Sequence, residues 1–574
     1  MVHSPALPTD TTIVAAVATD RFGGARTDVT MGFSSSDTTI ATVDANGIVR
    51  AKKPGVVNIK VSTCGESATT SVTIVASVAR VTVTPASDTV IAGDSATYTA
   101  RAFGADNSVV TGTKFTFTAS PSSTAIVHQT SDSTATIVGG GPGTGTVTAT
   151  AEGQSANSTV LVLARVFLAG SASANAIDVG DALGCGIITL GHSYCWGLNN
   201  HGQVGAKTTS TCFPGTDAGA ATDTTVKTTA LPCSLVPLRI SQDVDFNTIS
   251  AGDSSSCGIS LGGRLYCWGF NFHGEVGNGL TAAQQSPVLA LTGLTFTTVS
   301  VGGGHACGLA TGGTAYCWGD DTYGQLGDAR TVNSTTPIPV SGGGAPANFA
   351  SISAGYRHSC GVLANGTGFC WGNNDFGQLG NGAVGGFSDT PVLIAGFTFQ
   401  SISAGGDHSC GILTSGGIVC WGSNIDGQLG NGSVGGLSAT PVSIAGGGSF
   451  TRISASTGTR TSTPNGPAKP FGHGHTCALT TTGTVLCWGD DTDLQLGRGL
   501  FSGTGTSSGT PQPVFQGERP GGVTFTSIST GSRHSCGVGS DGNAYCWGSN
   551  VMGGLGNTLQ AAFRGQPQKV ATPN

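Results

Sequence analysis

With 574 residues the chain is too long for a single hydrophobic core, so several domains are expected. Its formal net charge is −7 at pH 7 and only 10% of its residues are charged, which gives no support to a basic nucleic-acid-binding face. Ninety-four glycines and the lack of long windows with helical apolar periodicity predict an all-β chain of strands joined by tight turns.

Cysteine usage indicates the compartment. Seventeen cysteines are present, and seven regularly spaced pairs account for most of them, which is typical of an oxidising environment such as a periplasm or the cell exterior. No apolar run of about 18 residues or more occurs, so no membrane span is predicted. Residues 1–20 lack the charged and apolar regions of a signal peptide. We therefore expect a secreted or cell-surface protein whose signal peptide is not present in this chain.

The first 165 residues alternate apolar and polar residues in short runs, which predicts half-buried antiparallel strands. Residues 65–68 match residues 153–156, and each match stands just before a final strand. This internal repeat predicts two β-sandwich domains, residues 1–78 and residues 79–165.

The first copy contains SSSDTTIATVDANGIVRAKKPGVVNIKVS, residues 34–62. This segment resembles the group 2 bacterial immunoglobulin-like domains of surface proteins such as intimins and invasins. The resemblance covers the first copy well, whereas the second copy keeps only the general pattern. It implies two immunoglobulin-like sandwiches that serve as a stalk or spacer.

The two copies differ at their starts. The second begins with RVTVTP at Arg80 and reaches its next strand near Ser95, whereas the first has only the residues before Thr11. We interpret the first copy as lacking most of one edge strand, through N-terminal truncation that also removes a signal peptide. A strand supplied by another chain is the alternative.

Cys64 is the odd cysteine. Its counterpart in the second copy is Glu152, a turn residue, so the thiol is expected to be exposed. An exposed odd cysteine can link two chains into a dimer, and an unreacted free thiol is the alternative.

From about Val166 onward the chain repeats a unit that contains Cys-Trp-Gly. All seven tryptophans stand between a cysteine and a glycine, and another cysteine lies ten positions before that cysteine. The fifth unit, FTFQSISAGGDHSCGILTSGGIVCWGSNIDGQLGNG, predicts four short strands near residues 398–403, 408–413, 417–421 and 441–444. Four strands in about 50 residues make one propeller blade, so seven units predict a seven-bladed β-propeller over residues 166–574.

These units resemble the repeats of the regulator of chromosome condensation family in a bacterial, cysteine-containing form. The resemblance extends over residues 166–574 and also implies a seven-bladed propeller. The predicted fold class is therefore all-β, with two N-terminal immunoglobulin-like β-sandwiches followed by a seven-bladed β-propeller.

The cysteine pairs are predicted to form disulfides. The midpoint of Cys410 and Cys420 falls within Thr-Ser-Gly-Gly, and a hairpin that turns there places the two cysteines opposite each other with Cα atoms roughly 4.5–5.5 Å apart. Pairs of buried thiols are the alternative. The cysteines predicted to be bonded, including one pair in the first insertion, are Cys185, Cys195, Cys212, Cys233, Cys257, Cys267, Cys307, Cys317, Cys360, Cys370, Cys410, Cys420, Cys477, Cys487, Cys536 and Cys546.

The other repeated residues are given structural roles. Each tryptophan points away from its neighbouring cysteine and is predicted to pack between adjacent blades. Histidine precedes the first cysteine by two positions in five units, and one nitrogen with two sulfur atoms could bind zinc. The spacing is not that of a known zinc site, so we predict hydrogen-bonded structural histidines, with neither metal nor cofactor. These residues are His305, His358, His408, His475 and His534.

Binding residues are expected where the repeat is interrupted or decorated. Three insertions, residues 205–235, 456–474 and 500–511, are long loops of the kind in which binding residues concentrate. The Asn-, Asp- and Gly-rich turn after Trp-Gly is interpreted as structural, because a calcium loop would need more carboxylates. Aromatic residues of these turns could form a small binding cluster, namely Phe270, Phe272, Tyr323 and Phe376.

The sequence contains no serine-hydrolase elbow, phosphate-binding loop or His-Glu-x-x-His motif, so we do not predict an enzyme. The favoured function is an extracellular or cell-surface binding or adhesion protein, with an unidentified protein as partner. One alternative is inhibition of a secreted enzyme, because a similar bacterial propeller family includes a β-lactamase inhibitory protein. A hydrolase with a site in the propeller channel is the other. The exchange-factor activity of the named family is not expected in this compartment.

Overall fold

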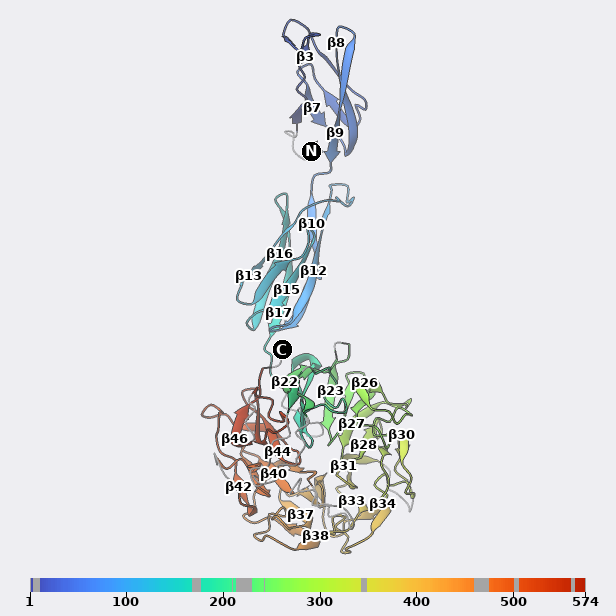
Figure 1. Ribbon diagram of the computed structural model, residues 1–574, viewed down its shortest axis with the longest axis vertical. Helices are drawn as coiled ribbons and strands as arrows, with labels where there is room; N and C mark the ends of the chain where they lie inside the picture. Colours follow the sequence, from blue (N-terminus) through green and yellow to red (C-terminus); the bar gives the residue numbers. More distant parts are fainter. Residues whose placement is uncertain are drawn as a thin grey trace. The chain divides into compact units, whose positions relative to one another are not determined.

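The structure, a computed structural model, describes residues 2–3, 11–167, 177–208, 210–212, 230–241, 243–341, 348–458, 474–499, 505–558 and 563–572. Over these residues the chain consists of strands and turns with one short 3-10 helix, η1 (Thr189–Gly191), so the predicted all-β class is confirmed. None of its described helical residues forms a segment that could cross a membrane. Two compact units make up the chain, Met1–Ala164 and Arg165–Asn574 (Figure 1).

The second half of the first unit is a pair of four-stranded sheets with the orders β10-β12-β15-β14 and β11-β17-β16-β13. The strands are β10 (Arg80–Thr84), β11 (Ser87–Ile91), β12 (Ser95–Phe103), β13 (Thr116–Ser120), β14 (Ala125–Gln129), β15 (Thr134–Gly139), β16 (Gly143–Ala151) and β17 (Gln154–Leu163). Alternation along the strands places every second side chain inward, and Tyr98 and Ile137 of one sheet share a buried core with Val147 and Val160 of the other.

The first half of this unit contains sheets with the orders β1-β9-β8-β5 and β2-β7-β6, and a two-stranded β3-β4 ribbon. The strands are β1 (Val2–His3), β2 (Thr11–Ile13), β3 (Ala18–Thr19), β4 (Ala25–Arg26), β5 (Gly32–Ser35), β6 (Ala41–Val43), β7 (Ile48–Ala51), β8 (Gly55–Thr63) and β9 (Glu66–Val75). Val49, Val57, Ile59 and Ile74 form its core.

The two halves differ beside their second strand. β12 pairs with both β10 and β15, whereas β2 pairs with β7, and the described residues contain no strand on its other edge. Cys64 lies in the exposed turn between β8 and β9, at a φ of 46° that its counterpart Glu152 shares at 47°. Disulfide-linked dimerisation through Cys64 stays a prediction.

The second unit contains seven sheets over its described residues, numbered here as sheets 1 to 7 in chain order. Sheet 1 comprises β18 (Ile177–Val179), β19 (Leu183–Ile187), β20 (Ser193–Leu198), β21 (Ser210–Cys212) and β22 (Leu231–Arg239), and sheet 2 comprises β23 (Phe246–Ala251), β24 (Ser255–Ser260), β25 (Leu265–Gly269) and β26 (Gln284–Leu289). Sheet 3 comprises β27 (Phe296–Val301), β28 (His305–Ala310), β29 (Ala315–Gly319) and β30 (Ser334–Pro339), and sheet 4 comprises β31 (Phe349–Ala354), β32 (His358–Leu363), β33 (Gly368–Asn373) and β34 (Phe387–Leu393).

The remaining three sheets repeat this four-stranded order. Sheet 5 comprises β35 (Phe399–Ala404), β36 (His408–Leu413), β37 (Ile418–Ser423) and β38 (Leu437–Ser443), and sheet 6 comprises β39 (Phe450–Ala455), β40 (His475–Thr480), β41 (Val485–Gly489) and β42 (Ser508–Pro513). Sheet 7 comprises β43 (Phe525–Thr530), β44 (His534–Gly539), β45 (Ala544–Ser549) and β46 (Phe563–Lys569). In sheet 5 the fourth strand begins at Leu437, four residues earlier than the sequence predicts.

The seven sheets form a closed ring (Figure 1). Each sheet packs on the next one, and β18 of sheet 1 packs on β43 and β44 of sheet 7. Every sheet is built from one continuous stretch of chain, so no strand is exchanged between the first and last sheets. Closure therefore depends on contacts between side chains and backbone at the junctions.

A belt of hydrogen bonds joins the inner strands around the ring. In sheets 2 to 7 a serine Oγ on the inner strand accepts the backbone N–H of the next inner strand, at distances of 2.9–3.1 Å. In sheet 1 Asp178 takes the place of this serine. Its carboxylate accepts the N–H of Ala251 at 3.0 Å and the hydroxyls of Ser250 at 2.9 Å and Ser529 at 2.6 Å. Asp178 thus bonds both neighbouring sheets at the junction where the ring closes.

We predict that Asp178→Ala destabilises the second unit by about 2–4 kcal/mol, because one N–H and two hydroxyls lose their acceptor in a buried position. Ser403→Ala is the matched control, since it removes a single acceptor from the same belt, and about 1 kcal/mol is expected for it. Tryptophan fluorescence during denaturant unfolding of the full chain follows this unit alone, because all seven tryptophans lie in it. Equal destabilisation by the two substitutions would contradict the role given to Asp178.

Candidate functional site

The paired cysteines lie on the second and third strands of each sheet, which together form its second hairpin. In sheet 5 Cys410 and Cys420 are register partners on β36 and β37, as the hairpin argument requires, and all seven regular pairs are bonded. Their Cα atoms are 4.0–4.1 Å apart, shorter than the predicted 4.5–5.5 Å. The observed value is close to the narrow, non-hydrogen-bonded spacing of an antiparallel ladder, about 4.5 Å. Cys212 and Cys233 form a further disulfide between β21 and β22.

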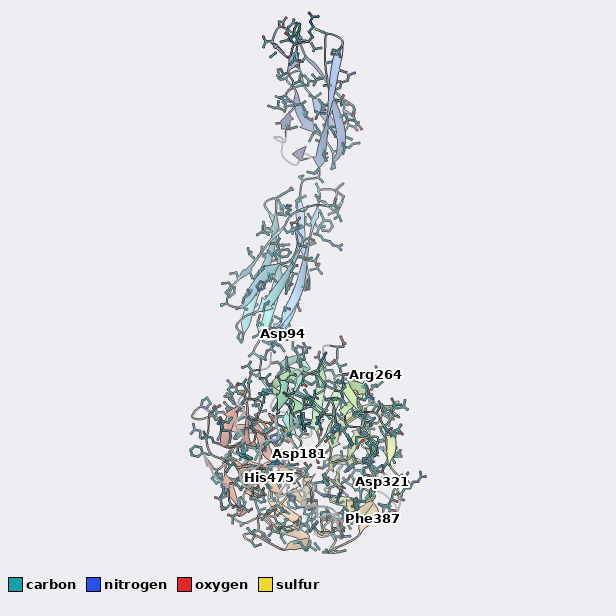
Figure 2. All side chains as sticks on the ribbon, viewed as in Figure 1. Asp94, Asp181, Arg264, Asp321, Phe387 and His475 are labelled. Carbon is teal, nitrogen blue, oxygen red and sulfur yellow. A yellow bond between two sulfur atoms is a disulfide. The ribbon has the colours of Figure 1, made fainter. Side chains whose placement is uncertain are left out.

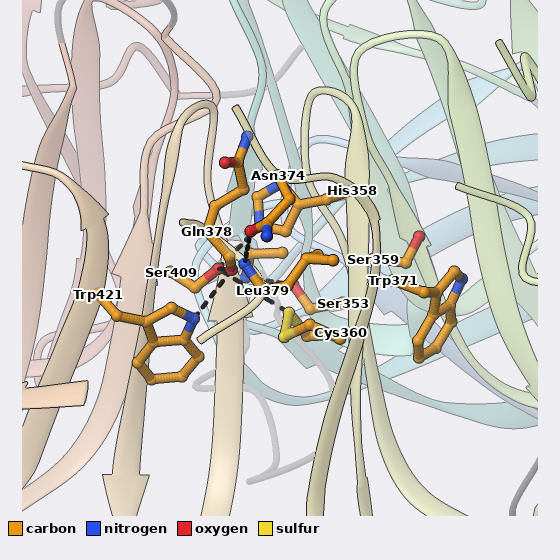
Figure 3. Close-up of a disulfide and its surroundings, with 12 residues drawn as sticks. Ser353, His358, Ser359, Cys360, Trp371, Asn374, Gln378, Leu379, Ser409 and Trp421 are labelled. Carbon is orange, nitrogen blue, oxygen red and sulfur yellow. Dashed lines mark hydrogen bonds between the residues drawn. A yellow bond between two sulfur atoms is a disulfide. The ribbon is translucent and has the colours of Figure 1, made fainter. Parts of the chain in front are cut away.

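The tryptophans lie at the junctions between sheets. All seven are fully buried, and each indole N–H donates to a backbone carbonyl in the turn of the preceding sheet. At the junction of sheets 4 and 5, Trp421 Nε1 lies 2.9 Å from the Gln378 carbonyl, which also accepts the Ser409 hydroxyl at 3.0 Å (Figure 3). One carbonyl of one sheet thus receives two donors from the next.

A histidine completes the same junction. His358 Nε2 is 2.7 Å from Ser409 Oγ (Figure 3), and because the serine proton is donated to Gln378, the histidine must be the donor. The ring is therefore the neutral tautomer with hydrogen on Nε2. Burial, with smaller contributions from neighbouring histidines, lowers the pKa of His358 to about 3. Equivalent bonds join His305 to Ser359, His408 to Thr476 and His475 to Ser535.

The histidines therefore have a structural role. In the structure the sulfur atoms of a pair are bonded to each other and are not free thiolates of the kind that bind zinc. The absence of a metal stays a prediction. His534 differs from the other four, since Gly184 of sheet 1 stands where the next sheet would supply a hydroxyl. Its Nε2 has no partner within the described residues.

Two sets of connections lie together on one side of the ring. The residue after Trp-Gly, which opens the connection from the third to the fourth strand, donates its N–H to the connection between the first and second strands. Phe270 bonds to Ser254 at 2.8 Å, and Asn373 bonds to Arg357 at 2.9 Å. We call this side the loop face. The three predicted insertions belong to these connections, but residues 213–229, 459–473 and 500–504 lie outside the described residues.

A recurrent turn shapes the loop face. In sheet 3 (Figure 2) the Asp321 carboxylate accepts the N–H of Leu326 at 2.9 Å. Gln325 accepts the N–H of Tyr323 at 2.8 Å through Oε1 and donates from Nε2 to Asp320 at 2.8 Å. Gly324 has a φ of 73°, and a Cβ there would lie 2.5 Å from the Asp389 Cα, so only glycine fits. The turn is structural and repeats around the ring.

Sheet 2 departs from this turn at two positions. Phe270 replaces the residue that accepts the glutamine amide, and Glu275 replaces the glutamine itself. Glu275 Oε2 still accepts an N–H, from His273 at 2.9 Å, but Oε1 has no partner within the described residues although the side chain is only 1% exposed. Burial raises the pKa of Glu275.

Four rings of sheets 1 and 2 form a group that we call the aromatic cluster. Phe270 and Phe272 stack with centroids 6.4 Å apart, His201 meets Phe270 edge-on at 4.9 Å, and His273 meets Phe272 edge-on at 5.2 Å. Phe272 is 70% exposed. An exposed aromatic side chain supported by further rings is typical of a protein-binding surface.

The four aromatic residues predicted from the sequence do not form one cluster. Phe270 and Phe272 are together, but Tyr323 instead lies against Arg357, whose guanidinium is 5.0 Å from its ring and 5.2 Å from that of Tyr356. Within the described residues no ring contact joins Phe376 to the other three. His273 lies in the same turn as Phe270 and Phe272, and His201 lies in the equivalent turn of sheet 1, but neither histidine is predicted as a binding residue from the sequence.

The inner strands surround a cavity of about 200 Å³ lined mainly by serine, threonine, alanine and isoleucine. Close to it, the Asp253 carboxylate accepts the Thr457 hydroxyl at 2.9 Å from across the ring. Burial and the neighbouring Asp181 carboxylate raise the pKa of Asp253 to about 8. Residues of different sheets assemble this acidic pair, so nothing in the sequence marks it.

Comparison with known proteins identifies the repeats. A family model described as "Regulator of chromosome condensation (RCC1) repeat" matches six segments of the chain. A second model with the same description matches three longer segments. The chain contains regulator of chromosome condensation repeats. The matched residues are 246–275, 296–325, 349–378, 399–428, 471–495 and 525–553 for the first model, and 262–309, 312–362 and 365–412 for the second.

Similar proteins share short segments or the fold. Protein pim1 of Schizosaccharomyces pombe is 36% identical over 80 residues, which is 14% of either chain, so the match spans a small part of that relative. Human WBSCR16 matches in structure with a TM-score of 0.53 at 19% identity, over 66% of this chain and 93% of that one. Prp20p of Saccharomyces cerevisiae has a TM-score of 0.51 at 18% identity, over 63% and 81%. At these identities the two solved structures show only that this chain shares the propeller fold.

We predict that the second unit loses stability as the pH falls below about 6.5. The unfolded chain then protonates a histidine of ordinary pKa, whereas folded His358 stays neutral down to about pH 3. The expected loss is about 1.4 kcal/mol per pH unit for each such histidine. His358→Gln keeps a donor without titrating, so unfolding followed by tryptophan fluorescence between pH 7 and 4.5 should show a slope reduced by about one proton. Identical slopes would refute the junction geometry.

Proposed function

We propose that this chain is an extracellular or cell-surface binding protein whose propeller presents the loop face to a protein partner. The aromatic cluster carries this proposal, because Phe272 is 70% exposed at the end of a series of packed rings. Isolated exposed apolar side chains are common, but stacked aromatic rings are enriched at the centres of protein interfaces.

In this proposal the seven sheets are seven blades, over residues 166–574, and the first unit supplies two immunoglobulin-like sandwiches, residues 1–78 and 79–165. The sandwiches act as a stalk or spacer of a bacterial adhesion protein. Support comes from the two-sheet core of the second half and from the shared hairpin turn at Cys64 and Glu152.

The proposed location rests on the cysteines. Eight disulfides are formed within the described residues, and disulfides persist in oxidising compartments rather than in the cytosol. A protein as a partner is supported by the yeast propeller Prp20p, whose structure is described together with its binding to Gsp1p and histones. We carry over only the general property of binding proteins.

Two alternatives are tied to particular observations. Inhibition of a secreted enzyme would use the same aromatic cluster against an enzyme surface. A hydrolase would use the acidic pair of Asp181 and Asp253, where the raised pKa suits a general acid. We favour binding without catalysis, because an acidic pair without an identified nucleophile or substrate cleft is weaker support than an exposed aromatic surface.

The test compares two exposed phenylalanines of the second unit. Phe272 belongs to the aromatic cluster, whereas Phe387, 53% exposed at the start of β34, does not (Figure 2). Surface and secreted proteins that bind to the full chain in a pull-down are purified. Their affinity for each variant is then measured by titration. We predict that Phe272→Ala weakens binding at least tenfold, as expected for an aromatic residue central to an interface, and that Phe387→Ala changes it less than twofold. Equal affinities for both variants would refute the loop-face proposal.

A further inference from the structure

We propose that Glu275 and the aromatic cluster of sheet 2 form a binding site for a cationic side chain, a lysine or an arginine, of the protein partner. This inference rests on the proposed function, because it places the partner on the loop face. It adds the chemical class of the group that the site recognises.

The turn after Trp-Gly in sheet 2 differs from the equivalent turns of sheets 3, 4 and 6. In sheets 3, 4 and 6 the glutamine Nε2 donates to the residue after Trp-Gly, at 2.8 Å in sheet 3 and 2.6 Å in the other two. In sheet 2 both partners are changed, to Glu275 and Phe270. A carboxylate oxygen therefore occupies the position of an amide that elsewhere donates, and the residue at the acceptor position is a phenylalanine.

One oxygen of the Glu275 carboxylate needs a hydrogen-bond donor or a counter-charge that the described residues do not supply. Glu275 Oε1 is buried without a hydrogen-bond partner in the described part of the chain, whereas Oε2 is bonded to the His273 N–H. Leaving a buried carboxylate without a donor or counter-charge is costly, and a nearby cation is the group that relieves this cost.

The aromatic rings of the same turn can also attract a cation. The faces of Phe270 and Phe272 carry the negative side of the aromatic quadrupole, which attracts ammonium and guanidinium groups. Phe272 is exposed and Phe270 is half-buried, so a cation can reach the Phe272 ring from solvent, and Glu275 of the same turn supplies negative charge. Direct contact between the cation and Oε1 is not required.

The edge of the His273 ring, which flanks Phe272, is compatible with a bound cation when the imidazole is neutral. His273 Nδ1 lies 2.9 Å from the Asn333 amide nitrogen, which is a donor, so Nδ1 accepts and the ring proton sits on Nε2. A side chain of lysine or arginine suits the site better than a metal ion. Its apolar stem can pack on the exposed Phe272 ring, whereas aromatic rings do not serve as metal ligands.

The chain itself offers a matched variant that removes the site and keeps the fold. Phe270→Asp combined with Glu275→Gln rebuilds in sheet 2 the pair that Asp320 and Gln325 form in sheet 3. Its unfolding midpoint, followed by tryptophan fluorescence, should equal or exceed that of the unchanged chain. Glu275→Gln alone keeps both rings and removes only the charge.

The experiment selects displayed random peptides on the full chain, with the double variant used for counter-selection. Selected peptides are then synthesised with their basic residue kept or replaced by norleucine, and their affinities are measured. We expect lysine or arginine in the enriched peptides, at least a tenfold loss of affinity with norleucine, a similar loss with the double variant and a smaller loss with Glu275→Gln. Enrichment of peptides without basic residues, absence of enrichment, or equal binding to the double variant would overturn the inference.

The outcomes also separate this inference from the proposed function. A protein partner that is lost with Phe272→Ala but binds the double variant normally leaves loop-face binding in place and overturns the cation site. Basic peptides that depend on Glu275, with no partner sensitive to Phe272→Ala, support the site and refute the proposed function.

Discussion

The junction between neighbouring sheets depends on one backbone carbonyl in each turn. The Gln378 carbonyl receives the Trp421 indole N–H and the Ser409 hydroxyl, and that hydroxyl accepts the N–H of His358. All of these groups are buried, so each bond that is made avoids the cost of an unpaired polar group in a dry interface. The indole bond recurs at all seven junctions. A serine or threonine hydroxyl accompanies it at five of them, whereas Gly184 of sheet 1 and Ala306 of sheet 3 supply none.

The disulfides make this junction reproducible. A bond between register partners fixes the hairpin, and the fixed hairpin sets which side of the sheet carries the tryptophan and which residues face the next sheet. Cysteine and tryptophan therefore belong to the scaffold. The proposed binding residues lie instead where the turn departs from its pattern, at Phe270 and Glu275, because a position released from the scaffold can serve another purpose.

Ring closure imposes a separate requirement. Sheets 1 and 7 are each complete, so their junction cannot be held by a shared strand and relies on the same kinds of contact as the others. Asp178 accepts the Ser529 hydroxyl of sheet 7 and the Ala251 N–H of sheet 2, whereas His534 Nε2 has no partner within the described residues. The closing junction is thus chemically distinct although its geometry is repeated.

The sequence by itself determined the features that are local along the chain. Repeats of Cys-Trp-Gly, the hairpin midpoint at Ser415 and the Asn- and Gly-rich turns define strands, register and cysteine partners, because residues ten positions apart on one hairpin meet whatever surrounds them. Only the tertiary structure decided which residues meet across junctions. His358 and Ser409 are 51 positions apart, about one repeat, and Val179 and Ser529 are 350 apart, but the repeat alone does not show which side chains of neighbouring sheets meet. The sequence places Tyr323 and Phe376 in one cluster on local grounds alone. The Glu275 oxygen that lacks a partner in the described part of the chain becomes visible only when burial removes water from around it.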